Sequence, residues 1–172
     1  MISLQDFLKI GDRVKEKWGR QFYKYVDFCG LEPVTKSYSP YESTPKNSVT
    51  FATTGGDGVH FGVLTDDKEL NGRQPIVMTV PMVSKNVILA DTLDEFLGLG
   101  FHNGWFPLEQ LVYSFDETIE YYSIQDDSLT IEQKNFLDLL RNELKISYSP
   151  LTKERLEILG TQYNDKLIVQ TE

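Results

Sequence analysis

The pattern of residues 48–64 constrains the fold of this chain more than any other feature. Residues 48–54 and 59–64 are both rich in β-branched and aromatic side chains. The residues between these two runs are Gly55, Gly56, Asp57 and Gly58. Glycine tolerates the positive φ angles that tight hairpin turns require, so we expect two antiparallel strands joined at this turn.

Two more strands and a helix are expected directly after this hairpin. Residues 75–81 and 86–90 are apolar and largely β-branched, as strands are. A helix is expected to start at Asp91, because Thr92 and Glu95 have the spacing of a capping box. Strands followed by an amphipathic helix predict an α+β fold, with a mostly antiparallel sheet flanked by helices.

Glycine and proline mark the positions where these elements end. Pro81 indicates an edge strand or the end of a strand, because proline has no N–H to donate. Gly98 and Gly100 are costly inside a helix, so we expect close packing or an early helix end there. Gly11 should weaken or break the first helix, which Ser3 is expected to cap. Further helices are expected at residues 21–28, 107–115, 130–145 and 152–160, and a short strand at residues 167–169.

The length and the cysteine content fit one intracellular domain. A chain of 172 residues is long enough for a single domain with its own core. Cys29 is the only cysteine, which excludes an intrachain disulfide and a CxxC zinc site and indicates a small buried apolar side chain. The N-terminus lacks a signal-peptide pattern, and no run approaches the ~20 apolar residues of a membrane span. We therefore expect a cytoplasmic protein without a membrane partner.

Acidic residues are concentrated in the middle of the chain. The formal net charge is −9, and no Lys or Arg occurs between Lys85 and Lys134. Ten acids lie in that stretch: Asp91, Asp94, Glu95, Glu109, Asp116, Glu117, Glu120, Asp126, Asp127 and Glu132. This charge opposes nucleic-acid binding, because phosphates are neutralised by basic surfaces. An acidic surface either serves solubility alone or steers basic protein partners toward it.

Motifs that carry catalysis are missing from the sequence. His60 and His102 stand 42 residues apart, without an HExxH or a Cys/His cluster, so both are expected to be structural. Neither a nucleophile elbow nor a phosphate loop is present. We therefore expect a non-enzymatic protein with no catalytic residues, no metal and no cofactor. The turn from Gly55 to Gly58 could cradle an anion through its N–H groups, but Asp57 would repel that anion.

Residues 48–115 resemble the SMI1/KNR4 family, also called the SUKH superfamily. The resemblance is carried by residues 51–64, 75–82 and 86–97, in which a glycine-rich hairpin precedes apolar strands and an acidic Ala-Asp-Thr-Leu-Asp-Glu-Phe-Leu helix. It implies one SMI1/KNR4-like α+β domain over residues 1–172, with residues 128–172 as a helical C-terminal extension. In bacteria the family is associated with immunity proteins that bind and block toxins, often nucleases. The resemblance thus implies a protein-binding inhibitor and no catalytic residues.

The acidic stretch and the resemblance together suggest a binding surface for a basic protein partner, such as a toxin domain. Its expected anchors are aromatic residues that neighbour acids, namely Trp105, Phe106, Tyr113, Tyr121 and Tyr122. The alternative for each of them is core packing, and we expect at least half of them to be buried. The expected partner-binding residues are Trp105, Glu109, Asp116, Glu117, Glu120 and Tyr121. The alternative is a regulatory module, or one that binds a small molecule or anion at Gly55, Gly56, Asp57 and Gly58.

Overall fold

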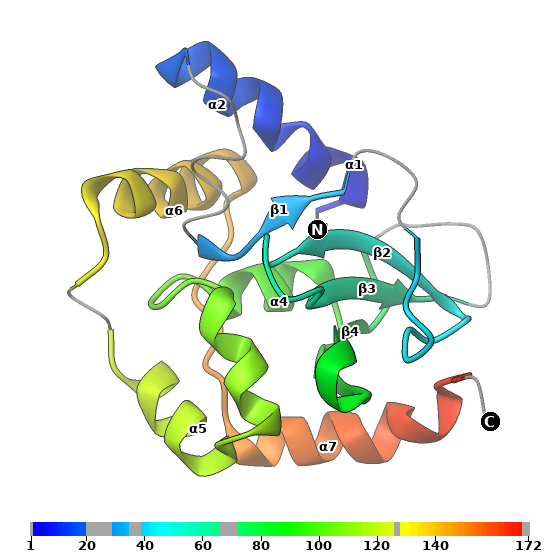
Figure 1. The fold of residues 1–172 in the computed structure, drawn as a ribbon. Coiled ribbons are helices and arrows are strands. Elements are labelled where there is room, and N and C mark those ends of the chain that lie inside the picture. Colours follow the sequence, from blue (N-terminus) through cyan, green and yellow to red (C-terminus); the bar gives the residue numbers. More distant parts are fainter. Residues whose placement is uncertain (1, 20–28, 35–38, 66–71, 126–127, 170–172) are drawn as a thin grey trace.

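The structure is a computed structural model, and it describes residues 2–19, 29–34, 39–65, 72–125 and 128–169. It confirms the α+β fold. Its antiparallel sheet has the order β1 (Glu32–Pro33), β2 (Ser48–Thr53), β3 (His60–Leu64), β4 (Ile76–Val80) and β5 (Lys85–Ala90). The described helices are α1 (Leu4–Leu8), α2 (Ile10–Trp18), α4 (Leu93–Leu99), α5 (Phe115–Ser123), α6 (Ile131–Leu144) and α7 (Lys153–Tyr163). Short 3₁₀ helices are η2 (Pro81–Val83), η3 (Phe106–Val112) and η4 (Asn164–Lys166) (Figure 1).

The expected hairpin is confirmed. Strands β2 and β3 pair antiparallel, with Thr53 opposite His60 at the turn. Gly55 and Gly58 have φ angles of 84° and 72°, which an L side chain rarely adopts. Pro81 ends β4, which lies inside the sheet, so the strand-end alternative holds for this proline.

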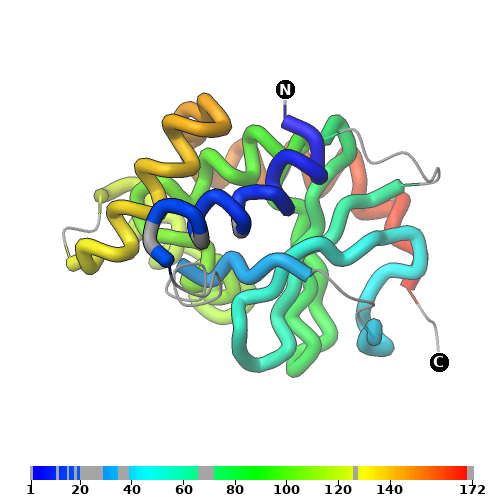
Figure 2. The backbone as a smooth tube through the Cα atoms, turned by 90° about the horizontal axis from the view of Figure 1, so that it is seen from above, coloured from blue at the N-terminus to red at the C-terminus, as the bar shows by residue number. Residues whose placement is uncertain are grey.

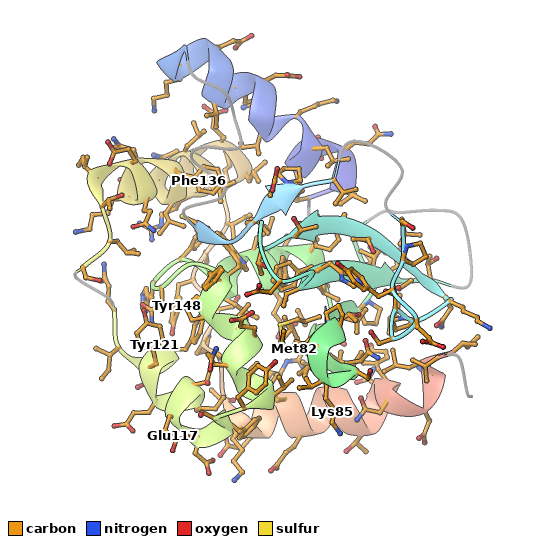
Figure 3. The ribbon with its side chains drawn as sticks, in the orientation of Figure 1. Met82, Lys85, Glu117, Tyr121, Phe136 and Tyr148 are labelled. Atoms are coloured by element: carbon orange, nitrogen blue, oxygen red, sulfur yellow. The ribbon has the colours of Figure 1, made fainter. Side chains whose placement is uncertain are left out.

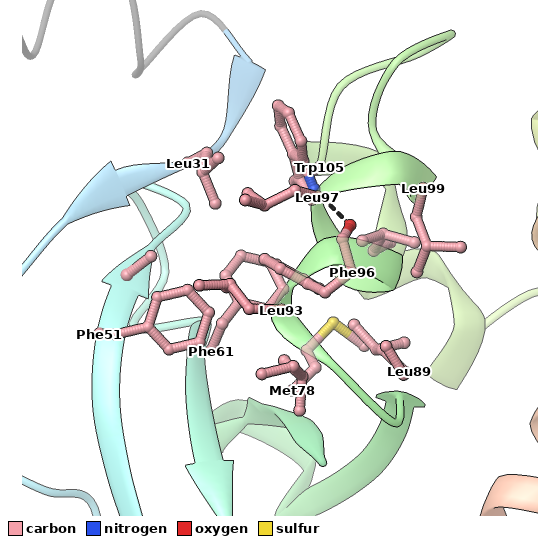
Figure 4. Packing of buried hydrophobic residues seen from close by; sticks show 14 of the residues in the cluster. Leu31, Phe51, Phe61, Met78, Leu89, Leu93, Phe96, Leu97, Leu99 and Trp105 are labelled. Atoms are coloured by element: carbon pink, nitrogen blue, oxygen red, sulfur yellow. Dashed lines mark hydrogen bonds between the residues drawn. The ribbon is translucent and has the colours of Figure 1, made fainter. Parts of the chain in front are cut away.

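Helix α4 packs across the sheet and forms the centre of the core (Figure 4). The ring of Phe96 lies 4.9 Å from that of Phe61 and 5.6 Å from that of Phe51, measured between centroids. The carbonyl oxygen of Phe96 accepts a hydrogen bond from Nε1 of Trp105 at 3.0 Å. Gly100 caps the C-terminus of α4 beside the Trp105 ring, so close packing and an early helix end both occur at this glycine.

Residues 39–47 and the C-terminal end of the described chain lie side by side. Asn47 donates to the carbonyl oxygen of Lys166 at 2.8 Å and accepts from the N–H of Ile168 at 3.0 Å. Figures 1 and 2 show these two segments together at one end of the molecule. The strand expected at residues 167–169 is wrong: this segment bonds to Lys46, Asn47 and Asn164 and does not join the sheet.

Several helix boundaries differ from the expected ones. The first helix breaks at Lys9 instead of Gly11, where α1 ends and α2 begins. Helix α7 continues beyond Gly160 to Tyr163, because burial of its apolar side chains outweighs the low helix propensity of one glycine. Only half of the expected box at α4 forms, since the Glu95 carboxylate accepts from the N–H of Asp91 instead of Thr92. The helix expected at residues 21–28 lies outside the described residues.

Among the residues that the structure describes, no helix has both the length and the apolar character needed to cross a membrane.

Candidate partner-binding surface

A bend at Ser114 separates η3 from α5 and shapes the surface of this region. Ser114 has φ −144° and ψ 70°, which is not a helical conformation. Its N–H donates to the carbonyl oxygen of Gln110 at 2.7 Å, and its own carbonyl accepts from the Thr118 hydroxyl at 2.6 Å. The single helix expected over residues 107–115 is therefore wrong: a 3₁₀ helix precedes the bend and an α-helix follows it (Figure 1).

A shallow, mainly apolar groove lies along η3 and α5. Its volume is about 280 Å³. Its lining residues are Pro107, Gln110, Ser114, Glu117, Thr118 and Tyr121. Pro107 and Gln110 come from η3, Ser114 is the bend, and Glu117, Thr118 and Tyr121 lie on α5. The groove combines the ring of Pro107 and the ring of Tyr121 with the carboxylate of Glu117.

Three aromatic side chains of η3, α5 and the connection between them are exposed to solvent, and one of them, Tyr121, lines the groove. The exposed fractions are 44% for Phe106, 49% for Tyr113 and 39% for Tyr121. Figure 3 shows Tyr121 and Glu117 on α5. Exposed aromatic residues around an apolar depression are typical of protein-binding surfaces, since aromatic side chains supply large contact area at low entropic cost.

Three acids remain available at this surface. Glu117 and Glu120 are exposed on α5, and Glu109 is half-buried on η3. Burial raises the pKa of Glu109, and the nearby charge of Asp57 adds to that effect. Within the described chain no Lys or Arg forms an ion pair with Glu109, Glu117 or Glu120. These three carboxylates, of which Glu117 alone lines the groove, lie on its two helices and are termed the acidic rim.

Other acids of the same sequence stretch are neutralised by the C-terminal helix. Arg155 on α7 pairs with Asp91 and with Glu95. Nζ of Lys153 lies 3.7 Å from Oδ1 of Asp116. The stretch without Lys or Arg in sequence is therefore not free of cations in space. Of the four acids expected to contact a partner, Asp116 is the one already paired.

Trp105 does not belong to this surface, which corrects the sequence-based expectation. Its side chain is 0% exposed, since Gly100 leaves room for its ring and Phe96 accepts from its Nε1. Tyr122 is also buried, at 1% exposed, and its hydroxyl donates to Gly104. Of the five expected anchors only these two are buried, so the expectation that at least half would be buried is wrong.

The Gly55–Gly58 turn carries Asp57, whose charge contributes to the raised pKa of Glu109 on η3. Tyr41 packs against Gly58, where an added Cβ would collide with the tyrosine ring. Two neighbouring carboxylates disfavour an anion at this turn.

The two histidines make internal contacts. His60 pairs its Nε2 with the Thr44 hydroxyl at 3.0 Å and its Nδ1 with the Gly58 carbonyl at 2.8 Å, and burial lowers its pKa. His102 stacks on Tyr148 with ring centroids 3.8 Å apart, and burial lowers its pKa as well. Among the described residues, no cluster of three or more His, Cys, Asp or Glu could hold a metal ion.

The sequence analysis missed four groove residues: Pro107, Gln110, Ser114 and Thr118. Gln110, Ser114 and Thr118 are spaced four residues apart in the sequence, as residues on one face of a helix are. The sequence analysis did not use this spacing, because it expected one helix that ended at residue 115, before Thr118.

A scan against protein-family models and a search of curated proteins each found no match to this chain. Membership of the SMI1/KNR4 family therefore stays a prediction.

Proposed function

We propose that this chain is a protein-binding domain that uses the η3–α5 groove and its acidic rim to bind a basic protein partner. The single observation that carries the proposal is the mainly apolar groove lined by Glu117 and by the exposed ring of Tyr121, on two helices that also carry Glu109 and Glu120. The resemblance to immunity proteins makes a toxin domain, such as a nuclease, the expected partner. In that role the chain occupies the basic substrate-binding surface of the toxin and blocks it.

The two halves of this surface have different physical roles. The groove and the exposed rings of Phe106, Tyr113 and Tyr121 supply apolar contact area, which dominates affinity. The unpaired acids attract a basic partner over distances of about 8 Å at physiological salt, and this raises the association rate more than the affinity. Nuclease surfaces that bind phosphates carry the complementary charge.

The groove also contains hydroxyl groups. These hydroxyl groups belong to Ser114, Thr118 and Tyr121, and the Thr118 hydroxyl donates to the carbonyl oxygen of Ser114. A nucleophile requires a neighbouring base within hydrogen-bond distance. The groove residues are suited to contact with a protein partner, because an apolar centre with polar edges is the usual composition of protein interfaces.

The test compares two sets of charge reversals of equal size. The first variant carries Glu109→Lys, Glu117→Lys and Glu120→Lys at the proposed surface. The matched control carries Glu154→Lys, Glu157→Lys and Asp165→Lys, which are exposed positions on α7 and η4. Both variants change the net charge by the same amount.

Association is measured against the protein encoded by the neighbouring gene, at low and at physiological salt. We expect the first variant to associate at least about tenfold more slowly than the parent at low salt, and the control to change far less. Equal rates for all three proteins, or a partner that is itself acidic, would refute the proposal. A partner that binds through this surface without being a toxin would support binding but assign the chain to the regulatory alternative.

A further inference from the structure

We propose that the η3–α5 groove recognises an arginine next to a large apolar side chain in the partner. The apolar side chain enters the groove, while the guanidinium pairs with Glu117 and stacks on the ring of Tyr121. This inference rests on the proposed function and specifies which chemical feature of the basic partner is read.

The size of the groove favours one side chain over a small-molecule ligand. A volume of about 280 Å³ lies at or below the lower limit of ordinary ligand pockets, which hold about 300–1,000 Å³. Shallow depressions of this kind accept single anchor residues in protein interfaces. The lining is mainly apolar, with Pro107 and Tyr121 contributing their rings, so a leucine-like or aromatic anchor fits its chemistry.

Glu117 and Tyr121 form a composite subsite at the edge of the groove. They are four residues apart on α5, so their side chains are neighbours on one face of the helix. Both line the groove and both are exposed. A carboxylate next to an aromatic ring suits arginine better than lysine, because the planar guanidinium donates two parallel hydrogen bonds and also stacks on the ring.

Glu120 provides an internal control for this subsite. Glu117 and Glu120 are both exposed on α5 and neither is in an ion pair within the described residues. Glu117 lines the groove, whereas Glu120 does not. If negative charge alone attracts the partner, replacing Glu117 or Glu120 should weaken binding equally. If the subsite recognises arginine, only the replacement of Glu117 should weaken binding.

The test uses four short synthetic peptides as probes and follows the amide signals of the full chain by NMR. The first peptide carries adjacent Leu and Arg. The others replace Arg by Lys, Arg by Gln, or Leu by Ser. Each is titrated into the parent, Glu117→Gln and Glu120→Gln, and urea unfolding verifies that both variants are folded.

We expect the Leu-Arg peptide to shift the amides of Glu117 and Tyr121 most strongly. Its dissociation constant should rise about tenfold with Glu117→Gln and less than about twofold with Glu120→Gln. The Lys, Gln and Ser peptides should each bind more weakly than the Leu-Arg peptide. Equal effects of the two variants, equal binding of the Arg and Lys peptides, or no shifts at the groove would each overturn the inference.

The experiments distinguish a failure of the arginine subsite from a failure of the proposed function. Equal losses with Glu117→Gln and Glu120→Gln, together with slow association of the triple charge reversal, leave the acidic surface in place and remove only the arginine subsite. An unchanged association rate of the triple reversal removes the proposed function itself.

Discussion

Arg155 of α7 holds the Glu95 carboxylate of α4 in a two-point contact. Its Nε donates to Oε1 at 2.7 Å and its Nη2 donates to Oε2 at 2.9 Å. The same Nη2 lies 2.6 Å from Oδ2 of Asp91, and Glu95 in turn accepts from the N–H of Asp91 at 2.8 Å. These contacts connect the C-terminal helix to the junction of β5 and α4, which are 60 or more residues away in sequence.

Removing this guanidinium should destabilise the protein. Arg155→Ala leaves two partly buried carboxylates facing each other, and hydrogen bonds to charged groups contribute about 1.5–3 kcal/mol each. We expect the free energy of unfolding to fall by about 1–3 kcal/mol, measured by urea denaturation. Asp138→Ala is the control, because its pair with Arg141 is exposed and its loss should change stability by less than about 0.5 kcal/mol. Equal losses in the two variants would contradict the role of Arg155.

The contact between Arg155 and Asp91 should make the free energy of unfolding depend on pH in the acid range. Burial acts to raise the pKa of Asp91, but the neighbouring Tyr163 hydroxyl and Arg155 guanidinium outweigh it, so the pKa of Asp91 lies below its usual value. The unfolded chain then binds a proton more readily than the folded one, and stability falls as pH drops below about 4. We expect Arg155→Ala to reduce this acid dependence in urea denaturation between neutral and acid pH. A slope identical to that of the parent would show that Asp91 is not held by Arg155.

Local patterns predicted strands β2 to β5 because each of them has its own signal, but not β1, which has only two residues, Glu32 and Pro33. β-branched runs and a glycine turn fix the hairpin, and the β4 and β5 runs follow the same composition. Capping residues likewise located α6, where Thr130 and Gln133 form the expected box. The connection through Arg155 was not predictable, because nothing local indicates which distant acids a surface arginine will reach.

The candidate site was only partly predictable for a related reason. Acid content along the chain identified Glu109, Glu117 and Glu120, but the cations that neutralise Asp116 and Glu95 come from α7. The burial of Trp105 depends on the space that Gly100 leaves, which is a tertiary relationship. The groove depends on the bend at Ser114, and serine at that position fits both a helix interior and a break.

His60 should add a second pH dependence closer to neutrality. Burial lowers its pKa, while the Gly58 carbonyl acts in the opposite direction. The unfolded histidine, with a pKa of about 6.5, takes up its proton first, so stability falls as pH decreases from about 7 to 5. We expect His60→Gln to flatten this dependence in urea denaturation. An NMR titration of the imidazole that gives a pKa at or above that of a free histidine would contradict the expectation.

Gly100 is expected to be indispensable for core packing, although glycine is a poor helix residue. An alanine Cβ at this position would collide with the ring of Trp105, which is fully buried and cannot move aside. Overpacking of this kind costs about 1–3 kcal/mol, whereas alanine gains at most about 1 kcal/mol of helix propensity. Gly100→Ala should therefore lower the free energy of unfolding, and Gly56→Ala, where nothing lies within 4 Å, should change it by less than about 0.5 kcal/mol. Because the collision is with one ring, Gly100→Ala combined with Trp105→Phe should lose less stability than the sum of the two single changes. Strict additivity in that double-mutant cycle would show that Trp105 is not what excludes a side chain at residue 100.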